Sequence, residues 1–229
     1  MSISIVIPCY EMKGAGNKYL DQLLSTIEAQ THKSKIEIVI SDDSESTMIE
    51  EVAAKYKHLH VVYCKNESNI KGLGINTNNG IRYSTNNQIK ILYQDDFFVR
   101  QDAISILLKH KQHDWSASSF IHYNENIRSF GHTQTPFYNT KIIDGVNTIG
   151  SPSVISFSKN LGESFDSTMN WFVDCEFYYR LKQKTELNVI PEILVGIRLH
   201  DKQTTNHITM ELVEREKLHI NNKHRLLQN

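Results

Sequence analysis

Short apolar runs alternate with stretches of helical periodicity along the first 100 residues. The runs have the length of buried strands and cover residues 3–7, 36–40, 60–63 and 89–93. The stretches between them carry apolar residues every three or four positions, and helix starts are predicted at Asn17, at the Thr47–Glu50 capping-box pattern and near Leu73. Strand and helix alternate four times, which predicts a parallel sheet covered by helices.

The second half of the chain has a less regular pattern. Strands are predicted at 115–123, 127–130, 154–157 and 194–199. A helix is predicted around Asp174, and an amphipathic helix from about Thr209. Because no linker rich in Pro or Ser separates these segments, we expect one domain over residues 1–229, divided into a half of about 1–98, a half of about 99–205 and a C-terminal helix in 206–229.

Composition and charge narrow the class of protein. Among the 229 residues, 25 are Lys or Arg and 26 are Asp or Glu, so the net charge is −1. The chain therefore lacks the positive field on which non-specific nucleic-acid binding depends, and we expect no nucleic-acid partner. A hydrophobic content of 39% is enough for a sizeable core, which favours a folded globular protein.

The N-terminal segment and the cysteines favour a reduced, cytoplasmic protein. The first apolar run stops at Pro8 and has no basic segment before it, so it is too short for a signal peptide. No stretch approaches the ~20 apolar residues that span a bilayer. Cys9, Cys64 and Cys175 are far apart and form no CxxC pattern, which argues against a disulfide framework or a thiolate metal site.

Acidic residues cluster near the ends of predicted strands. The clusters are Asp42-Asp43, Asp95-Asp96 and, after the irregular region, Asp174 with Glu176. Ligands of open parallel sheets bind at the carboxyl ends of the strands, so we expect these side chains to face one crevice. Carboxylates crowded there repel each other unless a cation or hydrogen-bond donors neutralise them. For any single cluster, an ordinary turn remains an open alternative.

His200 is the histidine best placed for chemistry, because it follows the late strand predicted at 194–199. If it faces the same crevice as Asp95 and Asp96, then carboxylate, imidazole and diphosphate oxygens would form an octahedral site for Mn²⁺ or Mg²⁺. A structural histidine at the strand end remains the alternative. Glycine-rich nucleotide signatures are incomplete, since Tyr19 stands where a dinucleotide fingerprint needs its third glycine.

In their order along the chain, these segments resemble family 2 glycosyltransferases with the GT-A fold. The motifs that carry the resemblance are Ser4–Glu11, Glu37–Ser44, Asn69–Gly80, Gln94-Asp95-Asp96 at the DxD position, Gly150–Ser153, Asp174–Leu181 and Arg198-Leu199-His200. The resemblance covers about residues 3–205. It implies an α/β fold of GT-A type, with a Rossmann-like, mostly parallel sheet flanked by helices and a small mixed acceptor-side half. Gln94 or Tyr93 replaces the first Asp of the DxD motif.

The resemblance implies a binding site for a nucleotide-sugar donor. The nucleotide would contact Pro8, Tyr10, Glu11, Asp42, Asn78 and Asp95. Asp42 would accept a hydrogen bond from the imide N–H of uracil, which favours a UDP-sugar. Asp96 and His200 would hold Mn²⁺ or Mg²⁺, which would offset the charge that develops on the departing diphosphate.

The resemblance also implies the catalytic group. Asp174 would be the general base of an inverting displacement, taking the proton of the acceptor hydroxyl as it attacks the anomeric carbon. Ser153, Trp171 and Glu176 would lie on the acceptor side, although Trp171 could equally be a core aromatic residue. The acceptor would be a glycan or a lipid-linked glycan, as in polysaccharide biosynthesis.

Two other functions and the role of the last helix remain open from the sequence. A sugar nucleotidyltransferase also combines an α/β sheet with an acidic metal site, but it normally has a Gly-rich, basic loop where Pro8–Glu11 stand here. A non-catalytic nucleotide- or glycan-binding module is compatible with Gln94 in the metal motif. The last helix carries Lys217, Lys223 and Arg225 near leucines that include Leu226 and Leu227, and it could be solvated, form a homodimer contact or touch the inner face of the membrane.

Overall fold

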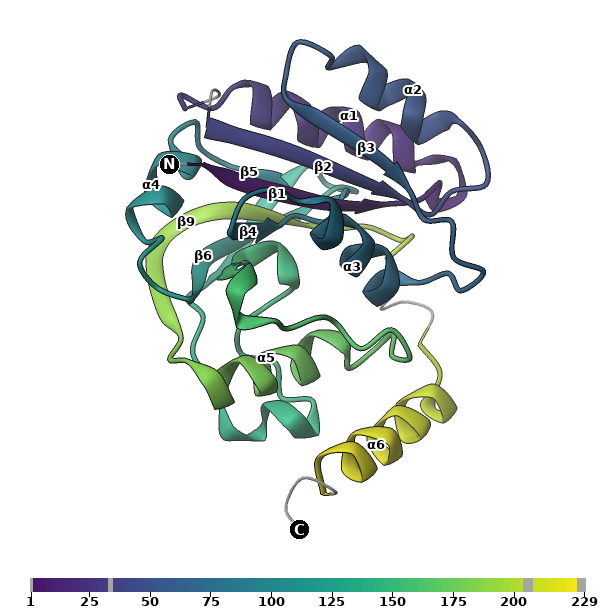
Figure 1. The fold of residues 1–229 in the computed structure, drawn as a ribbon, viewed down its shortest axis with the longest axis vertical. Coiled ribbons are helices and arrows are strands. Elements are labelled where there is room, and N and C mark those ends of the chain that lie inside the picture. Colours follow the sequence, from purple (N-terminus) through teal and green to yellow (C-terminus); the bar gives the residue numbers. More distant parts are fainter. Residues whose placement is uncertain (1, 33–34, 204–207, 226–229) are drawn as a thin grey trace.

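One sheet of nine strands runs through the computed structural model, which describes residues 2–32, 35–203 and 208–225 (Figure 1). The strand order is β3-β2-β1-β4-β8-β6-β9-β5, and β7 pairs with β6. The strands are β1 (Ile3–Cys9), β2 (Ile36–Asp42), β3 (Val61–Lys65), β4 (Gln88–Ile91), β5 (Phe97–Phe98), β6 (Trp115–Asn124), β7 (Ser129–Gln134), β8 (Ile155–Ser158) and β9 (Asn188–Leu199). The α-helices are α1 (Gly16–Glu28), α2 (Met48–Lys55), α3 (Leu73–Tyr83), α4 (Ala103–Lys109), α5 (Val173–Lys184) and α6 (Met210–Arg225).

The first half confirms the predicted parallel sheet. β1 pairs in parallel with β2 and with β4, and β2 pairs in parallel with β3. In Figure 1, α1 and α2 lie on one face of these strands and α3 lies on the other. The apolar side chains of α1, among them Leu20, Leu23 and Leu24, are fully buried. One helix start differs from the prediction, because α1 begins before Asn17. The start of α2 directly after Thr47 is confirmed, but Thr47 donates to Glu51 (2.7 Å) instead of forming a capping box with Glu50.

The second half is mixed, as predicted. β8 is antiparallel to both β4 and β6, so β6 runs in the same direction as β4, and β9 is parallel to β6. The predicted pairing of the strands around 115–123 and 127–130 is confirmed by the antiparallel hairpin of β6 and β7. As a consequence, the carboxyl ends of β1, β2, β4 and β9 lie at the same edge of the sheet, which is where the acidic clusters and His200 occur in the sequence.

The last helix, α6, packs against α5 (Figure 1). Its buried residues are Glu216, Ile220 and His224, which lie one turn apart on one face. Lys223 donates to Asp166 (2.6 Å), so its ammonium group faces the body of the protein. Leu226 and Leu227, named above for membrane contact, lie outside the described residues. Within the described ranges, no helix combines the length and the apolar character needed to cross a bilayer.

Candidate active site

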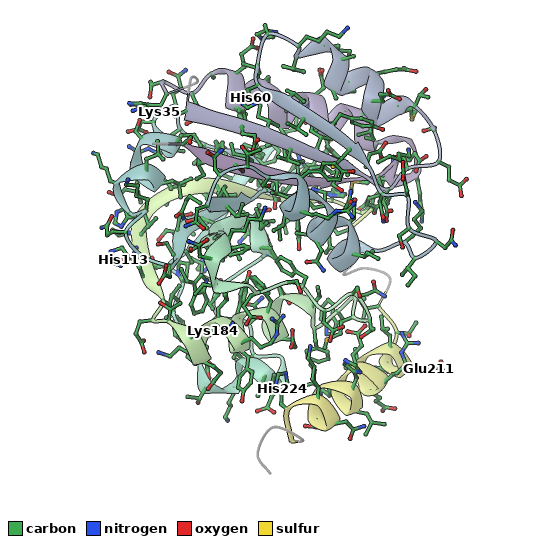
Figure 2. All side chains as sticks on the ribbon, viewed as in Figure 1. Lys35, His60, His113, Lys184, Glu211 and His224 are labelled. Carbon is green, nitrogen blue, oxygen red and sulfur yellow. The ribbon has the colours of Figure 1, made fainter. Side chains whose placement is uncertain are left out.

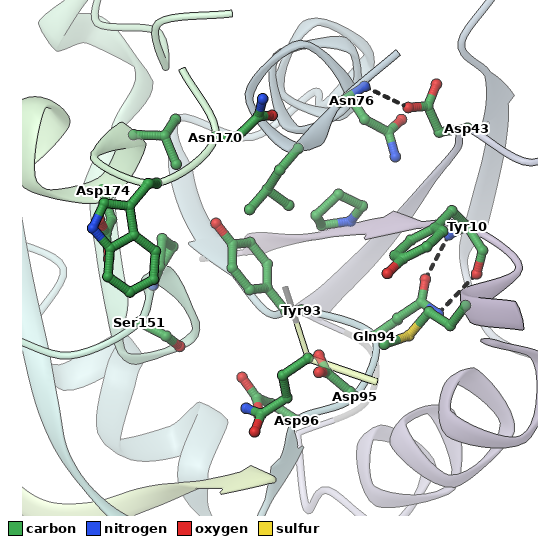
Figure 3. A pocket seen from close by; sticks show the side chains of 18 of the residues that line it. Tyr10, Asp43, Asn76, Tyr93, Gln94, Asp95, Asp96, Ser151, Asn170 and Asp174 are labelled. Atoms are coloured by element: carbon green, nitrogen blue, oxygen red, sulfur yellow. Dashed lines mark hydrogen bonds between the residues drawn. The ribbon is translucent and has the colours of Figure 1, made fainter. Parts of the chain in front are cut away.

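A cavity of about 510 Å³ opens at the carboxyl edge of the sheet (Figure 3). Half of the predicted site residues line it: Pro8, Tyr10, Asp95, Asp96, Trp171 and Asp174. They come from the ends of β1 and β4 and from the start of α5, which are segments far apart in the sequence. The structure therefore brings the predicted nucleotide side and the predicted base to one cavity.

Asp43, rather than Asp42, presents its carboxylate to this cavity. The Asp42 carboxylate is fully buried and accepts hydrogen bonds from Ser44 N (2.8 Å), Tyr63 Oη (2.6 Å) and Lys65 Nζ (3.0 Å). Burial opposes ionisation, but these donors together hold the pKa of Asp42 below its usual value. Asp42 is the last residue of β2, and because successive side chains of a strand point to opposite sides, the next residue faces the other way.

The Asp43 carboxylate is held in place by its neighbours across the cavity wall. It accepts hydrogen bonds from Asn66 Nδ2 (2.7 Å) and from the backbone N–H of Gly72 (2.9 Å), and Lys71 Nζ lies 3.3 Å away. Lys71, Gly72 and Asn76 also line the cavity. The Asn69–Gly80 segment thus contributes to the site through its first residues.

Glu11 and Asn78 do not line the cavity, and both hold loops instead. Glu11 Oε1 accepts from the backbone N–H groups of Glu45 (2.7 Å) and Ser46 (2.8 Å). Asn78 exchanges two hydrogen bonds of 2.8 Å with the backbone of Phe165. Asn78 lies two positions after Asn76 on α3, and residues two apart in a helix do not share a face.

Gln94 joins the loop after β4 to the loop after β1. Its Oε1 accepts from the backbone N–H of Tyr10 (2.6 Å), and its Nε2 donates to the backbone O of the same residue (2.9 Å; Figure 3). A carboxylate could not donate the second of these bonds. Gln94 is therefore fully engaged in holding the loop that carries Tyr10, and it is not a free ligand in the metal motif.

The side chains of Asp95 and His200 contact each other, and of the two only Asp95 lines the cavity. His200 Nε2 lies 2.9 Å from Asp95 Oδ2. Arg198 holds the backbone at Asp95, because its Nε donates to the Asp95 backbone O (2.7 Å). The Arg198 guanidinium is itself buried between the rings of Tyr19 and Phe97, with centroids at 4.9 and 5.1 Å. The sequence element Arg198-Leu199-His200 thus positions Asp95 from two sides.

Asp96, predicted with His200 as a metal ligand, lies deeper than Asp95, which was predicted on the nucleotide side. Asp96 Oδ1 accepts from the backbone N–H of Arg198 (2.9 Å). Burial, and next the charge of Asp95, raise the pKa of Asp96 to about 8. Lys90 is also buried nearby, and burial lowers the pKa of its amino group to about 7. Ser153, predicted on the acceptor side, is buried under this cluster, and its neighbour Ser151 lines the cavity instead.

Tyr93, one of the two residues that replace the first Asp of the DxD motif, has its hydroxyl group at the cavity. The hydroxyl is buried and has no hydrogen-bond partner within the described part of the chain, and the ring lines the cavity. Burial, with the nearby charges of Asp174, Asp96 and Asp95, raises the pKa of Tyr93 well above its usual value. The hydroxyl therefore keeps a proton that it can donate to a group bound in the cavity.

Asp174 is presented to the cavity at the start of α5, with both oxygens hydrogen-bonded. Asn147 Nδ2 donates to Oδ2 (2.8 Å), and the backbone N–H of Cys175 donates to Oδ1 (2.8 Å). Burial raises the pKa of Asp174 to about 6, against the opposing effect of these bonds. Such a carboxylate is charged at neutral pH and can accept a proton readily, as a general base must.

Glu176 belongs to the packing of α5 against α6 and not to the acceptor side of the cavity. It is fully buried and accepts from Arg180 Nε (2.8 Å), while Lys223 Nζ and His224 Nε2 lie 2.8 and 3.2 Å away. Figure 2 labels His224 on α6. It lies two positions after Asp174 on α5 and therefore faces another side of the helix.

Glu216 of α6 binds the backbone of the turn that precedes α5. Its Oε1 accepts from the backbone N–H of Asn170 (2.7 Å), and its Oε2 accepts from those of Trp171 (2.9 Å) and Phe172 (3.0 Å). These N–H groups belong to the turn that leads into α5, and a carboxylate near the N-terminus of a helix also complements the helix dipole. Glu216 therefore holds the loop that places Trp171 in the cavity wall.

We expect Glu216→Gln to destabilise the protein by about 1–3 kcal/mol, because an amide nitrogen would replace one of the two accepting oxygens and face an N–H group. Urea unfolding of the purified variant measures this change. Glu214→Gln is the matched control, since Glu214 is exposed on the same helix, and it should change stability by less than about 0.5 kcal/mol. Equal stability of the two variants would contradict the role of Glu216.

Comparison with known families decides the class of this site. Residues 4–181 match the model of glycosyl transferase family 2. The chain belongs to this family. It is 25% identical over 233 residues to an uncharacterised glycosyltransferase of Rickettsia typhi, covering 94% of this chain and 70% of that protein. It is also 25% identical over 213 residues to chondroitin synthase of Escherichia coli, covering 89% of this chain but 30% of that protein.

Solved structures confirm the predicted GT-A fold. The crystal structure of S. aureus TarS 1–349 in complex with UDP-GlcNAc superposes with a TM-score of 0.71 at 16% identity, covering 96% of this chain and 66% of that one. The mannosyltransferase PcManGT from Pyrobaculum calidifontis, in complex with GDP-Man and Mn²⁺, gives a TM-score of 0.61 at 12% identity, covering 85% and 56%. The protein is a glycosyltransferase, as predicted, and its cavity is the candidate active site.

Proposed function

We propose that this family 2 glycosyltransferase transfers a sugar from a UDP-sugar to a hydroxyl group of a glycan acceptor, with inversion at the anomeric carbon and with Mn²⁺ or Mg²⁺ bound. The observation that carries the proposal is the position of Asp174 in the wall of the same cavity as Asp43 and Asp95. The cavity thus offers a nucleotide side and a base within one enclosure.

The nucleotide side suits a uracil base. Tyr10 and Pro8 supply apolar walls, and Asp43 has carboxylate oxygens that can accept a further hydrogen bond from the imide N–H of the base. Cytosine has an acceptor nitrogen in place of this ring N–H. TarS, which has the same fold, was solved in complex with UDP-GlcNAc and with UDP, and PcManGT was solved with GDP-Man.

Asp95 and His200 would hold a divalent cation that replaces the hydrogen bond between His200 Nε2 and Asp95 Oδ2 (2.9 Å). The other ring nitrogen, Nδ1, accepts from the backbone N–H of Lys202 (3.2 Å), so Nε2 is the nitrogen that would ligate the ion. Carboxylate oxygen and imidazole nitrogen are suitable ligands for Mn²⁺, and PcManGT of the same fold was solved with this ion. No group of three or more His, Cys, Asp or Glu side chains suited to a metal occurs among the described residues. Diphosphate oxygens and water would therefore complete the coordination. When bound, the cation would supply positive charge beside the departing diphosphate.

Asp174 performs the proton transfer in this proposal. As the acceptor oxygen forms a bond to the anomeric carbon, the bond from that carbon to the diphosphate oxygen breaks, and UDP leaves with the electron pair. The acceptor proton passes to Asp174. Asn147 keeps the carboxylate pointed at the cavity, and the Tyr93 hydroxyl can donate to a donor oxygen.

Nucleotide binding provides the first test of the proposed function. Thermal shift is measured with UDP, TDP and GDP, each with and without Mn²⁺, and the largest shift is expected for UDP with Mn²⁺. Release of UDP from a panel of UDP-sugars then reports turnover. A non-catalytic binding module would bind UDP but release none from any donor, and a sugar nucleotidyltransferase would respond to a nucleoside triphosphate.

The pH profile tests the base. Because Asp174 must be ionised to accept a proton and its pKa is raised to about 6, the rate should fall as the pH drops through about 6 and reach a plateau above about 7. The measurement is kcat/KM for the acceptor between about pH 5 and pH 8 in buffers of constant ionic strength. A profile that stays flat down to pH 5 would exclude a base with this pKa.

A further inference from the structure

A second cavity of about 320 Å³ adjoins the first. The two cavities share four lining residues, namely Ser151, Trp171, Asp174 and Ile197, so the candidate base lies at the boundary between them. A group bound in the second cavity would therefore lie against Asp174 without occupying the cavity assigned to the nucleotide.

Two phenylalanine rings in the wall of the second cavity pack against glycine residues. Phe120 and Phe172 line it, and each ring lies against a glycine with positive φ. A Cβ atom at Gly150 would come within 2.7 Å of the Phe120 ring, and one at Gly145 within 2.4 Å of the Phe172 ring. The two rings are almost completely buried and form the apolar wall, while Trp171 is partly exposed and offers a flat surface of the kind that packs against the C–H face of a sugar ring.

The polar side chains of this cavity suit hydroxyl groups better than anions. Gln134 and His122 line the cavity, and Gln134 Nε2 donates a hydrogen bond to the backbone O of Thr148 (3.0 Å). No Lys or Arg is among the described lining residues, whereas Asp174 contributes a negative charge. Lys217 approaches the Phe172 ring, with Nζ 6.0 Å from its centroid, but it belongs to α6 and does not line the cavity.

We propose that the second cavity is the acceptor subsite and that it selects an uncharged sugar ring over a uronic acid or a phosphorylated sugar. The inference rests on the proposed function and adds the chemical class of the acceptor. An acidic ring would place an unpaired anion beside the Asp174 carboxylate in a partly desolvated site, and such a like-charge contact lowers affinity strongly. A neutral pyranose avoids this contact and can still donate its hydroxyl proton to Asp174.

The test compares acceptors that differ only in charge. Release of UDP from a UDP-sugar is measured at about pH 8, where histidine side chains are neutral, with methyl hexosides, methyl hexuronides and methyl hexoside 6-phosphates as the added acceptors. We expect neutral hexosides to stimulate release at least about tenfold more than either acidic class at equal concentration. Each tenfold step corresponds to about 1.4 kcal/mol.

A matched pair of variants links this preference to the second cavity. Gln134→Lys places a cation in the cavity wall and should shift the ratio of hexuronide to hexoside stimulation at least about tenfold toward the acid. Thr133→Lys adds the same charge one residue earlier on β7, where the side chain is exposed, and should leave the ratio unchanged. An equal response of both variants would overturn the assignment of the cavity.

The remaining outcomes separate this inference from the proposed function. A wild-type protein that prefers hexuronides or phosphorylated hexosides overturns the acceptor class. A protein that binds UDP and hydrolyses the UDP-sugar slowly, but responds to no neutral hexoside, also overturns it and leaves the donor assignment standing. A protein that binds no nucleotide contradicts the proposed function itself.

Discussion

Asp174→Asn should reduce sugar transfer by about 10²–10⁴-fold and leave the affinity for UDP nearly unchanged. The asparagine keeps the shape of the side chain but cannot accept the acceptor proton. Asp174 lies on the side of the cavity away from Asp43 and Gly72, so the nucleotide contacts should persist. Initial rates with a UDP-sugar and a neutral acceptor measure the first effect, and calorimetric titration with UDP measures the second.

The fold of this variant provides its control. Because burial raises the pKa of Asp174 above its value in the unfolded chain, its protonation contributes stability that is complete below about pH 3.8 and is lost as the pH rises through about 6. At pH 7 the wild type lacks this contribution, so Asp174→Asn should be at least as stable. Asp144→Asn, at an exposed carboxylate, should keep full activity. Full transfer by Asp174→Asn would exclude Asp174 as the base.

Asp95→Asn and His200→Ala should each weaken Mn²⁺-dependent binding of UDP by at least about tenfold. Each change removes one of the two protein ligands proposed for the cation, and the cation joins the protein to the diphosphate. Titrations with UDP in the presence of Mn²⁺ and in the presence of EDTA separate the metal-dependent part. The affinity measured in EDTA should change by less than about threefold, since the base contacts are intact.

Asp96→Asn distinguishes the two acidic positions of the motif. Asp96 is buried and accepts from the backbone N–H of Arg198 (2.9 Å), so its loss should lower thermal stability together with activity. Asp95 is more exposed, so Asp95→Asn should weaken Mn²⁺-dependent binding of UDP and leave thermal stability nearly unchanged. If Asp96→Asn alone abolished the Mn²⁺ dependence while Asp95→Asn kept it, the proposed ligand pair would be wrong.

The sequence predicted the framework of the site because the framework follows from local patterns. Four alternating strands and helices are visible as changes of hydrophobic period, and parallel pairing then brings their carboxyl ends to one edge. Pro8 and Asp95 reached the cavity for this reason, whereas Asp174 lies at the start of α5 in the less regular half. The family resemblance supplied roles for them that periodicity alone could not.

Two predicted site residues lie away from the cavity for physical reasons. Asp42 points to the other side because side chains alternate at the end of a strand, and Glu176 faces another side of α5 because a helix turns by about 100° per residue. Other residues of the site were missed because they are hydrogen-bond partners from distant segments, which no local sequence pattern reveals. Asn147 reaches Asp174 across 27 residues, and its role becomes visible only when the two segments are packed together.

The contact of Glu216 with the start of α5 bears on how this enzyme could be recombined with its relatives. The matching family segment ends at residue 181, yet the acceptor for three amide groups at residues 170–172 lies on α6. A chimera that joined residues up to 181 to the C-terminal segment of a relative would keep these three N–H donors but lack the Glu216 carboxylate that accepts from them. Successful exchange of the tail therefore requires an acidic side chain at the equivalent place, which makes α6 a coupled part of the catalytic module.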